Sequence, residues 1–344
     1  MKPFVSSLAV AALLVLAPAA FAGDPVWHFK PGKTFTYECT SEFHYIQFTP
    51  GTGATLQGGA QTNGLSAPGN NGGGTTGGTT TEDPQWETVV LRGTVLSVGD
   101  DGSARIEFLV ERVSIEVRFD ITGVHAKWDS AKSPKTELAG FRKYQAVAGH
   151  TFRAIIGPDG SVKEVSNGDW PKADEAGAVR NDKNDRENQA ADAVHVPTAP
   201  SVWLNLVFST APRDGAAWEQ TLKLPEEEKL SVKSDGTEAI GKHLCAKSRM
   251  KSADKERAVK AGDVKVEGAR DVAKIASAMI VAAQKKGMSW FSRADGVLVK
   301  LDFEGSAELG AVGGTTHATM KWGVDLKGQG VTEMKPAEPD APSK

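Results

Sequence analysis

The sequence contains little that points to a metal site or to catalysis. Its seven histidines are scattered, and no two stand at the His-x-His or His-Glu-x-x-His spacing that zinc sites use. Ser289 begins a stretch like a nucleophile elbow but lacks the second glycine, and Ser252 precedes Lys255 as in Ser-x-x-Lys enzymes without their companion motifs. We therefore predict no metal and no cofactor. No catalytic residue can be assigned, and an enzyme is the less favoured class.

The chain also lacks an excess of either charge and, beyond its N-terminus, any long hydrophobic run. Its 40 basic and 43 acidic residues are interspersed, whereas a nucleic-acid-binding protein concentrates basic residues in a patch. A membrane-spanning helix needs about 20 consecutive apolar residues, and no later stretch reaches that length. We therefore expect no nucleic-acid partner and no transmembrane segment in the mature chain.

The N-terminus has the three parts of a secretory signal peptide. Lys2 is the positive part, residues 4–16 are the apolar part, and residues 20–22 (Ala-Phe-Ala) fit the small-x-small cleavage rule. This makes residues 1–22 the leader and Gly23 the new N-terminus. An uncleaved anchor is the alternative, but the apolar run is shorter than a membrane span. We expect the protein to be exported, either to the periplasm or to the extracellular space.

Only two cysteines occur, Cys39 and Cys245. Disulfides persist in exported proteins, so one interpretation is a bridge between the two. Cys39 also shares its alternation face with Phe35 and Tyr37, which is typical of a small hydrophobic residue in a core. Both interpretations stay open from the sequence.

Four Asp-Gly pairs stand between runs in which apolar and polar residues alternate. Asp-Gly favours the primed turns of β-hairpins, because glycine adopts positive φ freely and aspartate tolerates it. The alternation extends over residues 86–120, 144–165, 289–303 and 316–326. The sequence therefore predicts a mainly β protein, a β-rich α+β fold with curved antiparallel sheet built from these hairpins. The four pairs are Asp101-Gly102, Asp159-Gly160, Asp235-Gly236 and Asp295-Gly296.

One stretch, residues 269–286, has the apolar spacing of a helix. Its apolar side chains recur every three or four residues from Val272 to Ala283, two lysines suit the negative helix end, and Gly287 follows as a C-terminal cap. We predict a helix that packs on the sheet. The alternative is a continuous buried strand, which the Ala-rich composition disfavours.

Composition divides the mature chain into two β-rich halves. The first half, residues 23–170, contains an insertion at 51–84 that is rich in Gly and Thr and nearly free of large apolar residues, so we expect it to be disordered. Residues 171–200 form a polar connector. The second half covers residues 201–334 and includes the predicted helix. The charged, Pro- and Ala-rich tail at 335–344 is expected to be disordered.

The two halves share a short motif. Residues 96–106 read Leu-Ser-Val-x-x-Asp-Gly-Ser-x-x-Ile, and residues 230–240 read the same with Thr in place of the second Ser. The match indicates two pseudo-repeated halves. The alternative is convergence, because hairpins of one type share turn residues for physical reasons.

The aromatic residues are biased toward tryptophan, with eight tryptophans against three tyrosines. Exposed tryptophans stack on sugars or line an apolar groove, and we take Trp86, Trp218 and Trp290 as candidate residues of a ligand-binding face. The alternative is that each tryptophan fills the core between strands.

Four segments, residues 29–37, 157–162, 215–218 and 292–296, resemble the turns and strands of uncharacterised exported β-rich bacterial proteins, which are known only as a domain-of-unknown-function family. The resemblance covers most of the mature chain and implies a β-rich fold. It transfers no catalytic residue.

Together these features favour an exported, non-enzymatic protein of the cell envelope or extracellular space. We expect it to bind an apolar ligand or a polymer such as a glycan through a sheet face. One alternative is an exported hydrolase whose carboxylates are dispersed in sequence and converge only in the fold. Another is a purely structural envelope protein, which would have no pocket.

Overall fold

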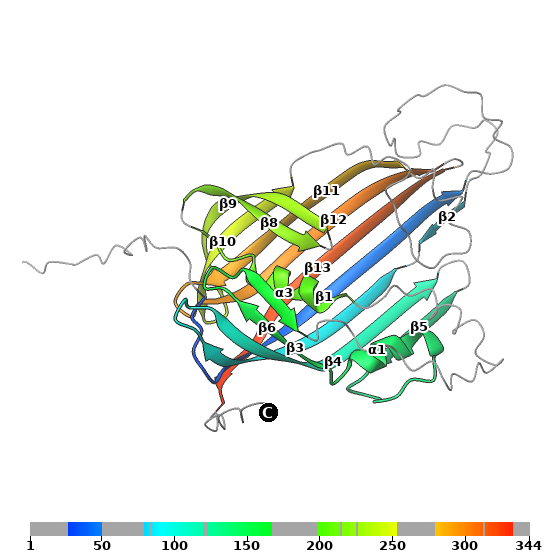
Figure 1. The fold of residues 1–344 in the computed structure, drawn as a ribbon. Coiled ribbons are helices and arrows are strands. Elements are labelled where there is room, and N and C mark those ends of the chain that lie inside the picture. The colour runs from blue at the N-terminus through cyan, green and yellow to red at the C-terminus, as the bar shows by residue number, and fades with distance from the viewer. Residues whose placement is uncertain are drawn as a thin grey trace, which may run out of the picture.

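Antiparallel strands predominate in the structure (Figure 1), which confirms the predicted β-rich class. The computed structural model describes residues 27–49, 79–82, 84–119, 123–166, 198–213, 215–224, 226–252, 279–311 and 314–332.

The described elements follow the chain in one order, strands first and helices inserted at two places. They are β1 (Lys33–Thr49), β2 (Thr79–Glu82), β3 (Gln85–Val98), β4 (Ala104–Phe119), β5 (Val124–Asp129), the 3-10 helix η1 (Ala139–Phe141), α1 (Arg142–Val147), β6 (Thr151–Ile156), β7 (Val162–Ser166), α3 (Pro200–Phe208), β8 (Ala217–Leu224), β9 (Glu226–Ile240), β10 (His243–Ser252), β11 (Met279–Ser292), β12 (Val297–Ala311) and β13 (Gly314–Val331).

The thirteen described strands form one antiparallel sheet. Their order is β7-β6-β4-β3-β1-β13-β12-β11-β10-β9-β8, with β2 on β1 and β5 on β4. The first and last strands, β1 and β13, are neighbours in the middle of this order and pair from Lys33↔Val331 to Gln47↔Thr316. Because the first and last strands of the described chain pair with each other, strands from both halves of the sequence belong to one sheet.

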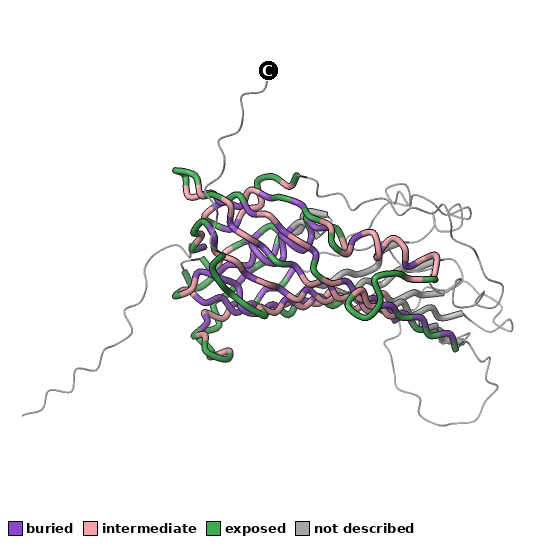
Figure 2. Tube along the Cα trace, turned by 90° about the horizontal axis from the view of Figure 1, so that it is seen from below, coloured by how far each residue is buried: buried purple, intermediate pink, exposed green. Residues whose placement is uncertain are grey.

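One face of the sheet carries the core. Along β1, Phe35, Tyr37 and Cys39 are buried while the residues between them are half-buried, and we call the face of these three residues the inward face. Figure 1 shows β6 and β8 to β10 in front of the central strands, with α3 between them. Buried residues gather at the end of the molecule where α3 and these strands lie (Figure 2).

Helix α3 lies against the inward face. All of its residues except Ser201 are buried, so the helix is apolar on nearly every side. The Phe208 ring contacts the rings of Phe35 and Phe108, and the Phe208 carbonyl accepts a hydrogen bond from Trp27 Nε1 at 3.2 Å. α3 is therefore a packed helix of the fold, at a place where the sequence pattern did not indicate one.

The helix predicted at residues 269–286 is wrong over the part that the structure describes. Residues 279–286 belong to β11, which begins its pairing with β12 at Met279↔Gly310. Residues 269–278 lie outside the described segments. The ladder of backbone hydrogen bonds to the neighbouring strand outweighs the helix propensity of alanine in this stretch.

Three of the four Asp-Gly pairs occupy hairpin turns, as predicted. Gly102, Gly160 and Gly296 have positive φ at the β3–β4, β6–β7 and β11–β12 turns. Asp235-Gly236 lies instead inside β9, where these two residues oppose one residue of β10 in a bulge. Gly236 still takes a positive φ, of 85°. The prediction of a fourth hairpin turn is therefore wrong. The Asp-Gly pair does not distinguish the two structures, because this bulge needs a glycine at positive φ just as a hairpin turn does.

The motif that the two halves share does not support the predicted pseudo-repeat. Residues 96–106 span the end of β3, a turn and the start of β4, whereas residues 230–240 all lie in β9. The shared motif therefore forms two different structures. Its common residues reflect the positive φ that both a turn and a bulge require.

The predicted boundaries fall partly outside the described chain. The insertion at 51–84 ends in a strand, because Thr79–Glu82 form β2 and pair with β1; most of its other residues are not described. The signal peptide 1–22 and the tail 335–344 also lie outside the described segments. Of the connector 171–200, the last three residues are described, and they lead into α3.

The two cysteines are free and buried, so the structure has no Cys39–Cys245 disulfide. Cys39 lies on β1 and Cys245 on β10, and β13, β12 and β11 stand between them. Neighbouring strands are about 4.8 Å apart, whereas a disulfide needs Cα atoms within about 7 Å. Cys39 is instead the small buried hydrophobic residue of the second interpretation.

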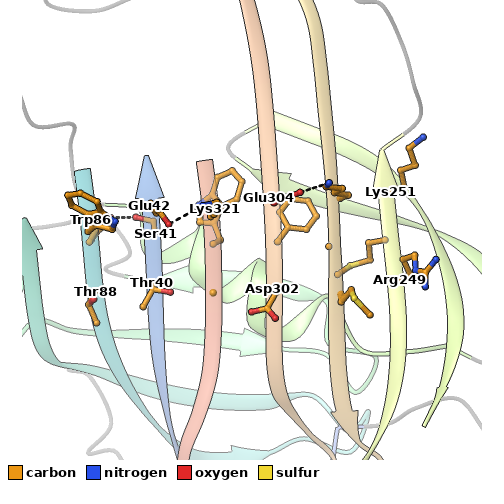
Figure 3. A pocket seen from close by; sticks show the side chains of 18 residues that line it. Thr40, Ser41, Glu42, Trp86, Thr88, Arg249, Lys251, Asp302, Glu304 and Lys321 are labelled. Atoms are coloured by element: carbon orange, nitrogen blue, oxygen red, sulfur yellow. Dashed lines mark hydrogen bonds and ion pairs between the residues drawn. The ribbon is translucent and has the colours of Figure 1, made fainter. Parts of the chain in front are cut away.

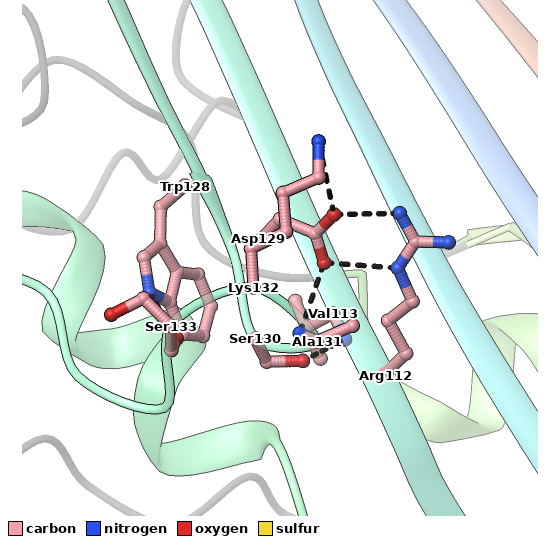
Figure 4. A network of polar contacts seen from close by, with 8 residues as sticks. All are labelled: Arg112, Val113, Trp128, Asp129, Ser130, Ala131, Lys132 and Ser133. Carbon is pink, nitrogen blue, oxygen red and sulfur yellow. Dashed lines mark hydrogen bonds and ion pairs between the residues drawn. The ribbon is translucent and has the colours of Figure 1, made fainter.

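An arginine and an aspartate fasten β5 to β4 (Figure 4). Arg112 donates from Nε and Nη2 to the two Asp129 oxygens at 2.9 and 2.7 Å. The Ala131 backbone N–H donates to Asp129 Oδ1 at 3.0 Å. The Arg112 guanidinium, helped by this N–H, holds the pKa of Asp129 below its usual range.

Asp129→Asn is expected to lower the free energy of unfolding at neutral pH by about 1 kcal/mol, because it removes a charge-assisted pair that solvent partly screens. Since the folded pKa is depressed, the wild-type contribution is complete above the ordinary aspartate pKa and is lost as pH falls through the folded value. Urea unfolding from neutral to acid pH measures this. The two proteins should converge at the acid end, and a constant difference would contradict the assignment.

Candidate binding cavity

Six inward-facing residues form one continuous row across the middle of the sheet. Paired residues of antiparallel strands point to the same face, so successive pairs mark neighbouring side chains. Each member of the row pairs with the next member on the adjacent strand. From β3 to β10, the row consists of Glu87, Ser41, Trp322, Phe303, Gly287 and Met250. We call it the cavity row.

The cavity row lines a cavity of about 690 Å³ (Figure 3). Its volume lies within the range of about 300–1,000 Å³ that is typical of pockets for small molecules. Residues that precede or follow the row on the same strands complete the lining. The cavity is therefore large enough to enclose a ligand rather than a few water molecules.

The middle of the cavity row is apolar. The rings of Phe303 and Trp322 have centroids 5.8 Å apart and are tilted by 43°. Met250 lies two strands beyond Phe303 in the same row. Aromatic rings offer large apolar surfaces, and the flexible thioether of methionine adapts to the shape of what it contacts. This part of the wall suits an apolar ligand.

Gly287 lets the Phe303 ring lie close to β11. A Cβ atom on Gly287 would clash with Phe303 Cδ2 and would stand 2.8 Å from the Asp302 carbonyl oxygen. Any side chain here would therefore displace the ring. A glycine inside a strand often marks such a close approach.

The next row of inward-facing residues closes the floor of the cavity. Ser289, one of its members, donates from Oγ to the carbonyl of Thr210 at 3.2 Å, just beyond α3. All members are at most 1% exposed. In the same strand order, this row consists of Val89, Cys39, Val324, Leu301, Ser289 and Ser248. This row is therefore completely buried, and the cavity is lined by the row after it.

The residues that flank the cavity row along the strands face outward, and several are charged. Lys321 forms an ion pair with Glu42 at 3.4 Å, and Lys286 forms one with Glu304 at 2.6 Å (Figure 3). Alternation therefore gives the same strands a charged outer face and an apolar inner face.

Glu87, at one end of the cavity row, is the one charged residue among the buried polar residues that the structure describes. Its Oε2 accepts hydrogen bonds from Ser41 Oγ at 3.1 Å and from Thr198 Oγ1 at 2.8 Å, and its Oε1 accepts one from the Thr198 N–H at 3.1 Å. Burial raises the pKa of the Glu87 carboxyl, and these hydrogen bonds oppose the shift only in part.

Two further polar residues adjoin Glu87. Gln85, two residues earlier on the inward face of β3, donates from Nε2 to Tyr144 Oη at 3.3 Å. Burial, followed by the nearby Glu87 charge, raises the pKa of Tyr144, so its phenol stays protonated. Together Ser41, Gln85, Glu87, Tyr144 and Thr198 form what we call the polar corner, of which Ser41 and Glu87 line the cavity.

The structure separates the three tryptophans that the sequence suggested for a ligand-binding face. Trp218 faces inward on β8, two pairs beyond Met250, and its Nε1 has no hydrogen-bond partner among the described residues. Trp86 borders the cavity but alternates with inward residues and faces outward. Trp290 also faces outward, and its Nε1 donates to Glu238 Oε2 at 3.0 Å. The three do not form one surface.

Sequence reasoning missed the aromatic residues of the cavity row, Trp322 and Phe303. One signal was available, because Trp322 shares its alternation with buried Val324, and Phe303 shares its own with buried Leu301. Alternation marks both rings as inward-facing. Alternation could not show that β12 and β13, which are far from β3 in sequence, place these rings in the same row as Glu87.

The described residues contain no group of three or more His, Cys, Asp or Glu side chains that could hold a metal ion. No helix in the described part of the chain is both long and apolar enough to cross a membrane.

Comparison with known proteins assigns no family. No protein-family model matches the chain, and no curated protein matches it. The chain is similar to a solved structure described as "Lipid-protein interactions in lipovitellin", with a TM-score of 0.46 and 8% sequence identity. The similarity covers 91% of this chain and 27% of the lipovitellin chain, so the chain spans about a quarter of that protein's length.

Glu87→Gln is expected to change the dependence of stability on pH. Because the folded pKa is raised, the folded state holds the proton more tightly than the unfolded chain does. The wild-type free energy of unfolding therefore falls as pH rises from the ordinary glutamate pKa through the raised one. The amide cannot ionise, so the variant should not show this decline. Urea unfolding across mildly acid pH measures the difference.

Glu42→Gln is the matched control for this measurement. Burial raises the pKa of Glu42, but contacts with His44 and Lys321 outweigh burial and hold that pKa below its usual range. Its replacement should change the slope in the opposite direction. If wild type and Glu87→Gln gave parallel slopes, the Glu87 carboxyl would not be buried as assigned.

Proposed function

We propose that the protein is an exported, non-enzymatic binding protein that holds a small apolar or amphiphilic molecule in its cavity. The observation that carries this proposal is the cavity row, in which Trp322, Phe303 and, beyond Gly287, Met250 line a cavity of about 690 Å³. Burial of apolar ligand surface against these side chains is favourable by about 25 cal/mol per Å². The signal-peptide pattern of the sequence supports export.

A cavity of this size is costly unless something occupies it. Protein cores are close-packed and contain few voids larger than a water molecule. Each unfilled volume forfeits the contacts that its lining side chains would otherwise make. The row beside the cavity is at most 1% exposed and contributes no residue to the lining, so side chains of this sheet pack closely where there is no cavity. An open, apolar cavity next to a packed core supports a binding role over a purely structural one.

Hydrolysis has less support from the same residues. An acid–base pair would need two carboxylates that converge on one point of the cavity. Glu87 faces inward, whereas Glu42, Asp302 and Glu304 alternate with inward residues and face outward. Within the described lining, no second carboxylate approaches Glu87 from the inward face.

A glycan ligand is also less well supported than an apolar one. Sugar platforms use exposed aromatic faces, and two of the candidate tryptophans, Trp86 at the border of the cavity and Trp290, face outward on their strands. Trp290 is only 7% exposed, which leaves little of its ring for stacking.

Fluorescence of N-phenyl-1-naphthylamine, a neutral apolar probe, tests the proposal. The wild-type full chain should bind the probe saturably. Ser41→Phe should weaken probe binding by about tenfold or more, roughly 1.4 kcal/mol, because a ring at this half-buried position of the cavity row occupies the volume that the probe needs.

Thr94→Phe is the control, since it adds the same bulk to a half-buried residue that faces outward on β3. Its probe affinity should match that of wild type, and urea unfolding of all three proteins verifies that each is folded. A wild-type protein that does not bind the probe, or a folded Ser41→Phe variant with unchanged affinity, would refute the proposed function.

A further inference from the structure

The cavity row differs in chemistry between its ends, and this difference bears on the kind of molecule that fits. Five strand intervals separate Glu87 on β3 from Met250 on β10. At about 4.8 Å per interval, the row follows the sheet for about 24 Å. It begins at the polar corner, and its apolar members are Trp322, Phe303 and Met250. A ligand that matches the row is elongated, with one polar end and an apolar body.

Glu87 is the one charged member of the cavity row, and it has no cationic partner among the described residues. A buried charge is normally paired or fully hydrogen-bonded, because removing it from water is costly. Arg249, Lys251 and Lys321 border the cavity but belong to the outward face. Lys321 is paired there with Glu42.

The Glu87 carboxylate accepts each of its hydrogen bonds and has room to accept a further one. Its three partners, the Ser41 hydroxyl, the Thr198 hydroxyl and the Thr198 N–H, all donate to it. An ionised carboxylate has about four lone-pair sites. Among the donors of the described chain, only the Thr198 N–H donates to Glu87 Oε1. A ligand N–H can therefore complete this set.

We propose that the ligand is an amphiphile with an amine at one end, whose ammonium group binds the Glu87 carboxylate while its apolar body lies along Trp322, Phe303 and Met250. The inference rests on the proposed function and specifies its ligand class. An ammonium supplies both the missing positive charge and an N–H donor, and a charge-assisted hydrogen bond of this kind is stronger than one from a neutral hydroxyl.

Competition against bound N-phenyl-1-naphthylamine with dodecylamine and 1-dodecanol tests the proposal, because these two molecules share a chain and differ in the end group. The wild-type protein should bind dodecylamine at least about tenfold more tightly than 1-dodecanol. In Glu87→Gln the preference should disappear, because the amide carries no charge to attract the ammonium group. Glu87→Asp, which keeps the charge, should retain part of the preference.

Glu38→Gln is the matched control. Glu38 lies on the outward face of β1, where it pairs with Lys327 at 2.8 Å, and its replacement should leave the amine preference intact. Equal wild-type affinities for the two molecules, or a preference that persists in Glu87→Gln, would overturn the amine assignment and leave the apolar cavity standing. Failure of both molecules to displace the probe would instead count against the proposed function.

A measurement on the wild-type protein covers the case in which Glu87→Gln does not fold. Nuclear Overhauser contacts from the methylene group next to the nitrogen of bound dodecylamine locate its polar end. Contacts with Ser41 or Thr198 protons support the proposal. Contacts of that methylene with Met250, at the other end of the row, would overturn it.

Discussion

The register between β1 and β13 is the constraint on which the rest of the structure depends. It joins the two ends of the described chain over the span from Lys33↔Val331 to Gln47↔Thr316, with one irregularity between Thr36 and Tyr37. Side chains alternate between faces along a strand, so a slip of one residue would turn every inward group of β13 outward. Trp322 would then leave the cavity and Lys321 would enter it. The cavity row exists because this pairing and four others agree in register.

The inward face serves two purposes in succession along the strands. Near the hairpin turns, α3 and the sheet bury one another, and the row through Cys39 and Leu301 is completely packed. One row further along, Phe303 and Trp322 line the cavity. Gly287 keeps Phe303 close to the sheet, while Glu87 places a buried carboxyl group at one end. The proposed binding function rests on the second region.

Local sequence patterns correctly predicted the strands and turns that depend on residues close together in the chain. Alternation indicated the antiparallel strands, and three Asp-Gly pairs marked real turns because hairpin geometry is set within a few residues. One prediction failed where tertiary contacts decide, because pairing with β12 makes residues 279–286 a strand instead of the expected helix. In addition, α3 formed in a stretch for which no helix was predicted. The cavity row was beyond reach, because its members come from strands between residues 33 and 331 and only the register brings them together. Alternation along β3 would have placed Trp86 on the outward face, because Trp86 directly precedes Glu87, which faces inward.

The central claim is that apolar molecules occupy the volume beside Trp322, Phe303 and Met250. A crystal structure of the full chain soaked with 1-bromododecane tests it most directly, because anomalous scattering locates the bromine without reference to the rest of the ligand. We expect a bromine peak and continuous chain density within the cavity along these three side chains. A cavity filled by the protein's own side chains, or bromine bound only elsewhere, would contradict it.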